Sequence, residues 1–498
     1  MASRGVVAAG HALTAEAGAK VLREGGNAVD AAVAAVIASF SLESALTGLG
    51  AGGFMMVGKP GEEPVLLDFF VAAPGHGGLE RREELIPVPV HFDANTTQVF
   101  NAGAASCGTP GMAAGLAAAL DRFGSMGLPD LIGDGVRFAR EGAPLNREQA
   151  YVLHILEPIY TATPEARAIY APEGRILGEG DSFRCPDLAD SLERFAAEGA
   201  EAFYRGDIPA RIEEYVHELG GVLSAADMAA YEVVPRDPVT AAFRGHEIFT
   251  NPPPSAGGIL IALCLTLLER GGETGTAEVA RVMDAANRAR DTGFAEELGR
   301  EDFALEFLSD ESVDRLGSTT HLAAMDEEGL CASVTCSNGT GSGLVVPGTG
   351  IHLNNMLGEE DLNPLGFHHS APGTRVSSMM SPTIIRREGE VVAGLGSAGS
   401  NRIRSAVLQT TINLLGRGLD PKAAVDAPRV HLEAGVLQAE PGVDEDALSG
   451  LEAAGREVFR WAEPNLFFGG VQMVTRDPAT GTLGGAGDPR RGGAVAAV

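Results

Sequence analysis

Positive charge is scarce in this chain of 498 residues, which has 37 lysine and arginine residues against 67 aspartate and glutamate residues. Lysine in particular is nearly absent, occurring only at Lys20, Lys59 and Lys422. The formal net charge of -30 argues against a nucleic-acid partner, because an acidic surface repels phosphates instead of releasing their counterions. The charge favours high solubility.

Cysteine is also sparse, and its spacing does not suggest a metal or redox centre. The five cysteines are an odd number and are widely spread, with no Cys-x-x-Cys pair. The pair His368-His369 is adjacent and lacks the i, i+4 spacing of a helical zinc site. We therefore expect no metal and no cofactor, and we expect the thiols to be small buried side chains. They are Cys107, Cys185, Cys264, Cys331 and Cys336.

Long apolar runs are missing as well. The longest one near the N-terminus, from Ala31 to Ser41, is too short to span a bilayer and suits a core helix. No basic segment followed by an apolar one precedes the globular sequence at Gly5. We expect no membrane partner and a cytoplasmic location, or a periplasmic or secreted one if a leader has been removed.

The composition predicts a large globular fold. With 45% hydrophobic and 21% charged residues, the chain has enough apolar material for a sizeable core. Asn27 followed by Asp30 is typical of a helix N-cap, and a preceding helix is expected from Thr14 to Gly25. Interleaved helices and strands without a long linker indicate packed layers. Further helices are expected at 112–123, 186–197, 208–219, 255–269 and 407–416, and strands at 54–57, 320–325, 332–335, 351–354, 381–386 and 390–395.

A glycine-rich segment at 48–53 matches the dinucleotide-binding pattern G-x-G-x-x-G. That pattern requires a strand before it and a helix after it, whereas here a helix is expected before and a strand after. A tight turn that admits close backbone contact is the better interpretation.

The chemistry depends on residues 317–322, Gly-Ser-Thr-Thr-His-Leu, where a turn leads into a strand. Alone, a threonine pair at the start of a strand is ordinary β structure. However, this segment and Met-Asp-Glu-Glu-Gly at 325–329 resemble the processing site of the γ-glutamyltransferases, which are N-terminal-nucleophile hydrolases. Further matches to that family follow in order along the chain at 9–11, 24–32, 52–55, 109–111, 253–258, 353–355, 381–383, 396–400 and 488–490.

The resemblance implies an α+β fold, a four-layer αββα sandwich, and a chain that cuts itself between Ser318 and Thr319. The large piece would be residues 1–318 and the small piece 319–498, forming one intertwined heterodimer, with a dimer of such heterodimers as an open alternative. The new N-terminal Thr319 would be the nucleophile. Its α-amino group, with a typical pKa of about 7.7–8.0, would be the base.

The resemblance also assigns supporting residues. Ser337 matches a second hydroxyl residue that bonds the nucleophile and helps processing, although it is equally typical of a buried strand serine. Gly399 and Ser400 match the two backbone amides of the oxyanion hole. The family usually has glycine at both positions, so the site requires Ser400 to adopt a backbone angle that suits a residue with a Cβ.

The expected substrate pocket departs from the family. Phe70 stands where an arginine usually binds the α-carboxylate of the γ-glutamyl group, and losing such a partner costs about 2–5 kcal/mol. Arg375, Arg402 or Arg404 remain as alternative sources of charge. The paired serines of the pocket correspond to the run 377–381, where Ser378 is retained and Met379 replaces one of them. The residues that match the binders of the substrate amino group are Asn338, Met356 and Glu359.

We therefore predict a self-processing zymogen that becomes an amide hydrolase or transferase, acting through a Thr319 acyl-enzyme on a small γ-glutamyl compound such as glutathione. One alternative is another acyl amide, as in the related cephalosporin acylases, because the arginine is replaced. A second is an unprocessed, non-catalytic homologue. A serine hydrolase is disfavoured, because Leu395 occupies the first glycine of a G-x-S-x-G elbow around Ser397.

Overall fold

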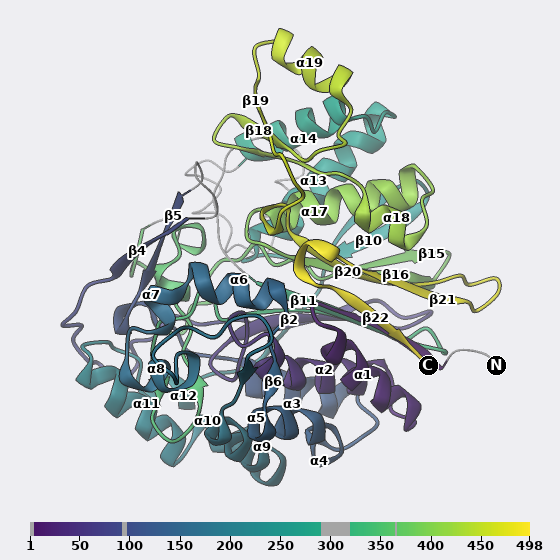
Figure 1. Ribbon diagram of the computed structural model, residues 1–498. Coiled ribbons are helices and arrows are strands. Elements are labelled where there is room, and N and C mark those ends of the chain that lie inside the picture. The colour runs from purple at the N-terminus through teal and green to yellow at the C-terminus, as the bar shows by residue number, and fades with distance from the viewer. Residues whose placement is uncertain (1–3, 92–96, 290–318, 364–365) are drawn as a thin grey trace.

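The structure is a computed structural model that describes residues 4–91, 97–289, 319–363 and 366–498. Two β-sheets stack face to face in its centre, and helices cover the outer face of each sheet (Figure 1). Helices α1, α2 and α3 contact the first sheet, while α13, α17 and α18 contact the second. The expected four-layer αββα architecture is confirmed.

The first sheet has seven strands in the order β22-β1-β11-β12-β2-β3-β8, and every neighbouring pair is antiparallel. The second has six strands in the order β21-β20-β16-β15-β10-β9, also antiparallel. The strands of the first are β1 (Gly5–Ala9), β2 (Gly52–Gly58), β3 (Val65–Phe69), β8 (Val234–Arg236), β11 (Thr320–Asp326), β12 (Cys331–Ser337) and β22 (Ala494–Ala497). Those of the second are β9 (Val239–Phe243), β10 (His246–Thr250), β15 (Thr383–Arg387), β16 (Glu390–Ala398), β20 (Gly470–Arg476) and β21 (Leu483–Gly487).

The helices form two groups in sequence as well as in space. The group on the side of the first sheet comes from the first half of the chain: α1 (Ala12–Arg23), α2 (Ala28–Leu42), α3 (Met112–Phe123), α4 (Leu128–Leu131), α5 (Gly133–Glu141), α6 (Arg147–Ile155), α7 (Glu157–Tyr160), α8 (Pro164–Tyr170), α9 (Pro186–Glu198), α10 (Glu201–Tyr204), α11 (Asp207–Glu218) and α12 (Ala225–Ala229). The group on the other side is α13 (Ala256–Gly271), α14 (Thr276–Arg288), α17 (Arg402–Thr411), α18 (Pro421–Asp426) and α19 (Glu445–Ala453). Smaller strand pairs and one small sheet complete the fold: β4 (Ile86–His91) with β5 (Thr97–Ala102), β6 (Ala143–Pro144) with β7 (Ser182–Phe183), β13 (Val345–Val346) with β14 (Ile351–His352), and β17 (Val430–Glu433), β18 (Val436–Ala439) and β19 (Glu457–Arg460).

Both faces of the first sheet are buried, and the side chains of each strand alternate between them. In β1, Val7 and Ala9 belong to the core beneath the helices, whereas Val6 and Ala8 belong to the core between the two sheets. Successive side chains of a strand point to opposite faces, so a strand buried on both sides reads as a continuous apolar run. This explains why β1, β2 and β11 lack an alternation of apolar and polar residues.

Most of the expected elements are present within a few residues of their predicted bounds. Asn27 and Asp30 form the predicted capping box of α2, in which each side chain accepts a hydrogen bond from the other's backbone. The glycine-rich segment lies between α2 and β2, so the dinucleotide interpretation lacks its strand and helix in the required order. A Cβ on Gly50 would lie 2.1 Å from the His352 carbonyl oxygen, which confirms the expected close backbone approach.

Three predicted boundaries were wrong. The first helix begins at Ala12, because the imidazole Nδ1 of His11 accepts the Leu13 N–H at 3.1 Å and acts as the cap. Strand β14 ends at His352 rather than residue 354, since the Asn354 amide binds the carbonyl oxygens of the Gly50 and Gly108 loops. The helix expected at 407–416 begins earlier, at Arg402, and its last turn, 412–416, is a π-helix.

The cysteines agree with the expectation of small buried side chains. All five cysteines lie in the described part of the chain and are buried and free. Burial raises the pKa of the Cys107 thiol to about 12, which makes it an unreactive small side chain. Among the described helices, we find none whose length and apolar character would let it cross a membrane.

Candidate active site

A small cavity gathers residues that are far apart in the sequence. Its apolar lining belongs to the core between the two sheets. Most of the lining side chains were singled out in the sequence, whereas Leu362, Met380 and Ile403 were not, because an apolar residue carries no chemical signal of a site. The lining residues are Phe70, Thr319, Ser337, Met356, Glu359, Leu362, Ser378, Met379, Met380, Ser400 and Ile403.

Thr319 reaches the cavity because of its place in the first sheet. It immediately precedes β11, in which Leu322 and Ala324 face the helices and Ala323 and Met325 face the other sheet. By the same alternation Thr319 lies on the side of the other sheet, and it is buried there. The partner residue is set by register: Thr320 lies opposite Cys336, so the next pair along is Thr319 and Ser337. Both of these side chains line the cavity.

Thr320 faces the other side of the sheet. Its hydroxyl donates a hydrogen bond of 2.6 Å to Glu43 Oε2, and the Thr14 hydroxyl donates one of 3.0 Å to Glu43 Oε1. Burial raises the pKa of the Glu43 carboxyl, although the hydroxyls of Thr320 and Thr14 act in the opposite direction. Glu43 was not predicted from the sequence, because an acidic residue at the end of a helix gives no signal of burial.

Ser337 is the last residue of β12 and is buried. Its Oγ accepts a hydrogen bond of 2.9 Å from the backbone N–H of Gly339. A hydroxyl that accepts in this way keeps its own proton and can donate it, so Ser337 can serve as a donor to an oxygen in the cavity.

Gly399 and Ser400 form a turn between β16 and α17, and both have positive φ angles, 113° and 71°. A side chain at residue 399 is excluded, since a Cβ there would lie 2.8 Å from the Gly469 Cα. Ser400 adopts the left-handed conformation that glycine would adopt more easily, which costs about 1–2 kcal/mol. The turn precedes the N-terminus of α17, where the helix dipole favours a negative charge.

Two of the sequence-predicted residues that the structure describes, Asn338 and Gly399, do not line the cavity. Asn338 is fully buried, and its Nδ2 donates to the His352 carbonyl oxygen at 3.1 Å. Gly399 adjoins the cavity only through its neighbour Ser400. Ser318, on the other side of the expected cleavage site, lies outside the described residues.

Phe70 occupies one wall of the cavity and is almost completely buried. Its ring stacks on that of Phe54, with the centroids 5.3 Å apart, and its backbone N–H donates to Asp68 Oδ1 at 3.0 Å. The neighbouring Asp68 is paired with Arg236 and Arg375. The ion pair therefore holds the strand end in place, while the phenyl ring enters the cavity.

Glu359 is the charged residue among the described side chains that line the cavity. It follows the short 3₁₀ turn Met356–Gly358, and its Oε1 accepts from the backbone N–H of Thr340 at 3.3 Å. Ser378 also lines the cavity, and its Oγ accepts from the backbone N–H of Met380 at 3.0 Å.

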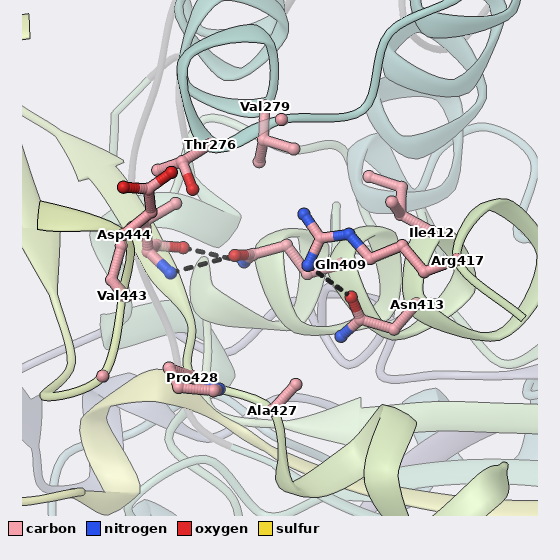
Figure 2. Close-up of a pocket in the computed structure, with 13 residues that line it drawn as sticks. Thr276, Val279, Gln409, Ile412, Asn413, Arg417, Ala427, Pro428, Val443 and Asp444 are labelled. Atoms are coloured by element: carbon pink, nitrogen blue, oxygen red, sulfur yellow. Dashed lines mark hydrogen bonds between the residues drawn. The ribbon is translucent and has the colours of Figure 1, made fainter. Parts of the chain in front are cut away.

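A second and larger pocket of about 340 Å³ lies between the N-terminus of α14 and the end of α17, and shares no described lining residue with the first. Figure 2 shows the Arg417 guanidinium within it, donating to Asn413 Oδ1 at 3.0 Å. Gln409 is held by Ser405 and by both backbone polar groups of Val430. Among the described residues that line it, Thr276 alone carries a hydroxyl and none is a serine or cysteine, so acyl-transfer chemistry is better supported in the first cavity.

Comparison with known proteins agrees with the fold and with the order of the motifs. The family profile described as Gamma-glutamyltranspeptidase matches residues 14–291 and 296–498. The chain is 31% identical to the glutathione hydrolase proenzyme of Escherichia coli (strain K12), over 98% of this chain and 91% of that protein. It is also 31% identical to the acylase ACY 1 proenzyme of Pseudomonas sp. (strain SE83), over 100% and 94%.

Among solved structures, the cephalosporin acylase from Bacillus halodurans is similar to this chain with a TM-score of 0.83 and 27% identity, covering 99% of this chain and 96% of that one. The similarity in sequence and in structure therefore extends over nearly the whole chain. The protein belongs to the γ-glutamyltranspeptidase family of N-terminal-nucleophile hydrolases and is an amide hydrolase or transferase of that type.

Proposed function

We propose that Thr319 is the nucleophile of this enzyme and that the chain creates it by cutting itself between Ser318 and Thr319. The observation that carries the proposal is the meeting of Thr319, Ser337 and Ser400 in one small cavity, although 81 residues separate the first from the last. A threonine hydroxyl needs a nearby base, and cleavage supplies one on the same residue, since the amide nitrogen becomes an amine.

The topology supports a processed enzyme whose two pieces stay together. In the first sheet, β11 and β12 of the piece 319–498 lie between β1 and β2 of the piece 1–318. In the second sheet, β15 of the small piece pairs with β10 of the large one. Cutting one peptide bond leaves all these ladders intact, so the product is an intertwined heterodimer.

The reaction follows from the atoms that meet in the cavity. The Thr319 amine, directly or through one water, takes the hydroxyl proton as Oγ1 attacks the carbonyl carbon of the substrate amide. The new C–O bond forms, the C–N bond breaks, and the departing amine takes the proton. Water, or an acceptor amine, then attacks the ester carbon, and Thr319 Oγ1 leaves with a proton.

The supporting residues act on the two oxygens of this reaction. Ser337 is the donor to Thr319 Oγ1 and holds it in place before attack. The backbone N–H groups of Gly399 and Ser400 stabilise the oxygen that becomes negative in the tetrahedral intermediate, and loss of one such donor typically costs about 10²–10³ in kcat. The N-terminus of α17 adds a favourable dipole at the same place.

The substrate is a small-molecule amide. The names of the relatives suggest two acyl classes, γ-glutamyl compounds such as glutathione and the acyl amides cleaved by acylases. Phe70 favours the second class, because it stands where the family resemblance places the arginine for the α-carboxylate.

Trapping the acyl-enzyme tests this proposal. The processed protein is mixed with a reactive anilide and quenched within the first turnover, and the fragment 319–498 is weighed by mass spectrometry. We expect a mass increase equal to the acyl group on the N-terminal threonine. The Thr319→Ser variant, which keeps the hydroxyl and the amine, should also be labelled. Label on another residue, such as Ser397, would contradict the proposal.

A further inference from the structure

The cavity around Thr319 has the wrong charge for the γ-glutamyl group. Of its described lining residues, Glu359 has a carboxylate side chain, and none is a lysine, arginine or histidine. Six of the others are apolar: Phe70, Met356, Leu362, Met379, Met380 and Ile403. A γ-glutamyl group brings both an amine and a carboxylate, and among these described residues only the amine finds an opposite charge.

The arginines that might supply the missing positive charge are oriented elsewhere. Arg375 binds Asp68 Oδ1 at 3.1 Å and lies over the Tyr231 ring, with its Cζ 4.4 Å from the centroid. Arg402 donates from Nε to the Phe467 carbonyl oxygen and stacks on that ring, and Arg404 donates to Asn287 Oδ1 at 2.9 Å. None of these three lines the cavity.

Phe70 cannot make room for a charge by turning away. Its ring is stacked on Phe54, its carbonyl oxygen accepts from the Tyr231 hydroxyl at 2.7 Å, and only 1% of its surface is exposed. A carboxylate placed against this ring would lose its water without gaining a partner, which is strongly unfavourable for an ionised group. An amine directed at the Glu359 carboxylate gains a partner of opposite charge.

A 4-aminobutyryl group meets this requirement of charge, because it is the γ-glutamyl chain without the α-carboxylate.

Resting on the proposed role of Thr319, we infer that the enzyme cleaves amides of short ω-amino acids, such as 4-aminobutyryl amides, whose acyl group carries an amine and no carboxylate. Glu359 binds the ammonium group, and the ring of Phe70 with Met379 and Ile403 covers the methylene chain. The γ-glutamyl and glutaryl groups are poor substrates because their carboxylate faces the apolar wall.

Four 4-nitroanilides of matched chain length test the inference with the processed enzyme. They are the butyryl, 4-aminobutyryl, glutaryl and γ-glutamyl compounds, which carry neither group, the amine, the carboxylate, or both. We expect kcat/KM to be highest for 4-aminobutyryl and to fall by about thirtyfold or more on adding the carboxylate. A higher kcat/KM for γ-glutamyl than for 4-aminobutyryl, or for glutaryl than for butyryl, would overturn the inference.

Two variants test whether Glu359 and Phe70 determine the preference for the acyl group. Glu359→Gln should lower kcat/KM for 4-aminobutyryl relative to that for butyryl, because only the amine loses its charged partner. Phe70→Arg should raise the γ-glutamyl and glutaryl rates relative to butyryl. Phe70→Leu is the matched control, which changes size without adding charge and should keep the parent order of the four compounds. An unchanged preference in both charge variants would refute the roles of Glu359 and Phe70.

Different results would contradict the proposed substrate class and the proposed nucleophile. If mass spectrometry finds a new N-terminus at Thr319 but none of the four compounds is cleaved, the acyl class is wrong and the nucleophile stands. If the chain stays uncut, or Thr319→Ala cleaves 4-aminobutyryl anilide as fast as the parent, the proposed function itself is wrong.

Discussion

Thr320 Oγ1 donates a hydrogen bond of 2.6 Å to Glu43 Oε2, on the opposite side of the first sheet from the cavity that Thr319 lines. Adjacent threonines thus have separate surroundings because strand side chains alternate. The second threonine anchors the start of β11 to the end of α2, and this contact holds the first in register with Ser337.

Replacing Thr320 by valine should therefore affect both stability and chemistry. The variant leaves a buried carboxylate oxygen without its donor, at an expected cost of about 1–3 kcal/mol, and it loosens the position of Thr319. We expect a lower melting temperature and slower self-cleavage. Thr14→Val is the matched control, since it removes the other hydroxyl from Glu43 but lies on α1, away from the nucleophile. It should lower stability alone, and equal slowing of cleavage in both variants would argue against the anchoring role.

Ser400→Gly should preserve activity and leave stability unchanged or slightly higher. Relief of the positive φ angle gains about 1–2 kcal/mol, partly offset by about 0.5–1 kcal/mol for the greater freedom of glycine in the unfolded chain. The backbone N–H proposed for the oxyanion hole remains. Thermal unfolding and steady-state kinetics measure both effects.

The control for this change is Glu388→Gly, in an exposed turn that also has a positive φ angle, 53°. It should show a similar stability change without any effect on kcat. A large fall in kcat for Ser400→Gly would instead indicate that the serine hydroxyl takes part in the reaction.

His321 should make the fold sensitive to acid. Burial lowers the pKa of its imidazole from 6.5 to about 3, and its Nδ1 lies 2.8 Å from Thr335 Oγ1. Between these two pH values the unfolded chain binds a proton that the folded chain does not, so this contribution to stability is present above pH 6.5 and is lost as the pH falls toward 3. From pH 7.5 to 5 the loss is about 2 kcal/mol.

His321→Gln removes this titration. The variant is expected to be less stable than the parent at pH 7.5, because its side chain fills the space beside Gly396 less well, but its stability should fall less on moving to pH 5. Melting temperatures of both proteins at the two pH values measure the difference. Parallel falls would show that His321 does not carry the acid sensitivity.

Much of the fold was predictable because its signals are local. The capping box at Asn27, the proline and glycine boundaries of the helices and the apolar runs of the strands depend on neighbouring residues. The glycine-rich turn was interpreted correctly from the order of its flanking elements. The cap at His11 was missed, since an imidazole nitrogen is an uncommon substitute for a hydroxyl or carboxylate at that position.

Only some of the residues that line the cavity could be predicted from sequence motifs. Residues with polar or reactive side chains, such as Thr319 and Glu359, were predicted from the family resemblance, and both line the cavity. Asn338 was placed among the substrate binders, but its side chain lies against the His352 carbonyl. The apolar members Leu362, Met380 and Ile403 and the buried carboxylate of Glu43 depend on long-range packing, which no local pattern reveals.

Intact mass spectrometry of the purified protein, beside its Thr319→Ala variant, tests the central claim most directly. We predict that the parent separates under denaturing conditions into fragments 1–318 and 319–498, the second beginning with Thr319, and that the variant remains a single chain of 51.4 kDa. A parent that stays whole while cleaving its substrate, or a variant that is cut and active like the parent, would contradict the account.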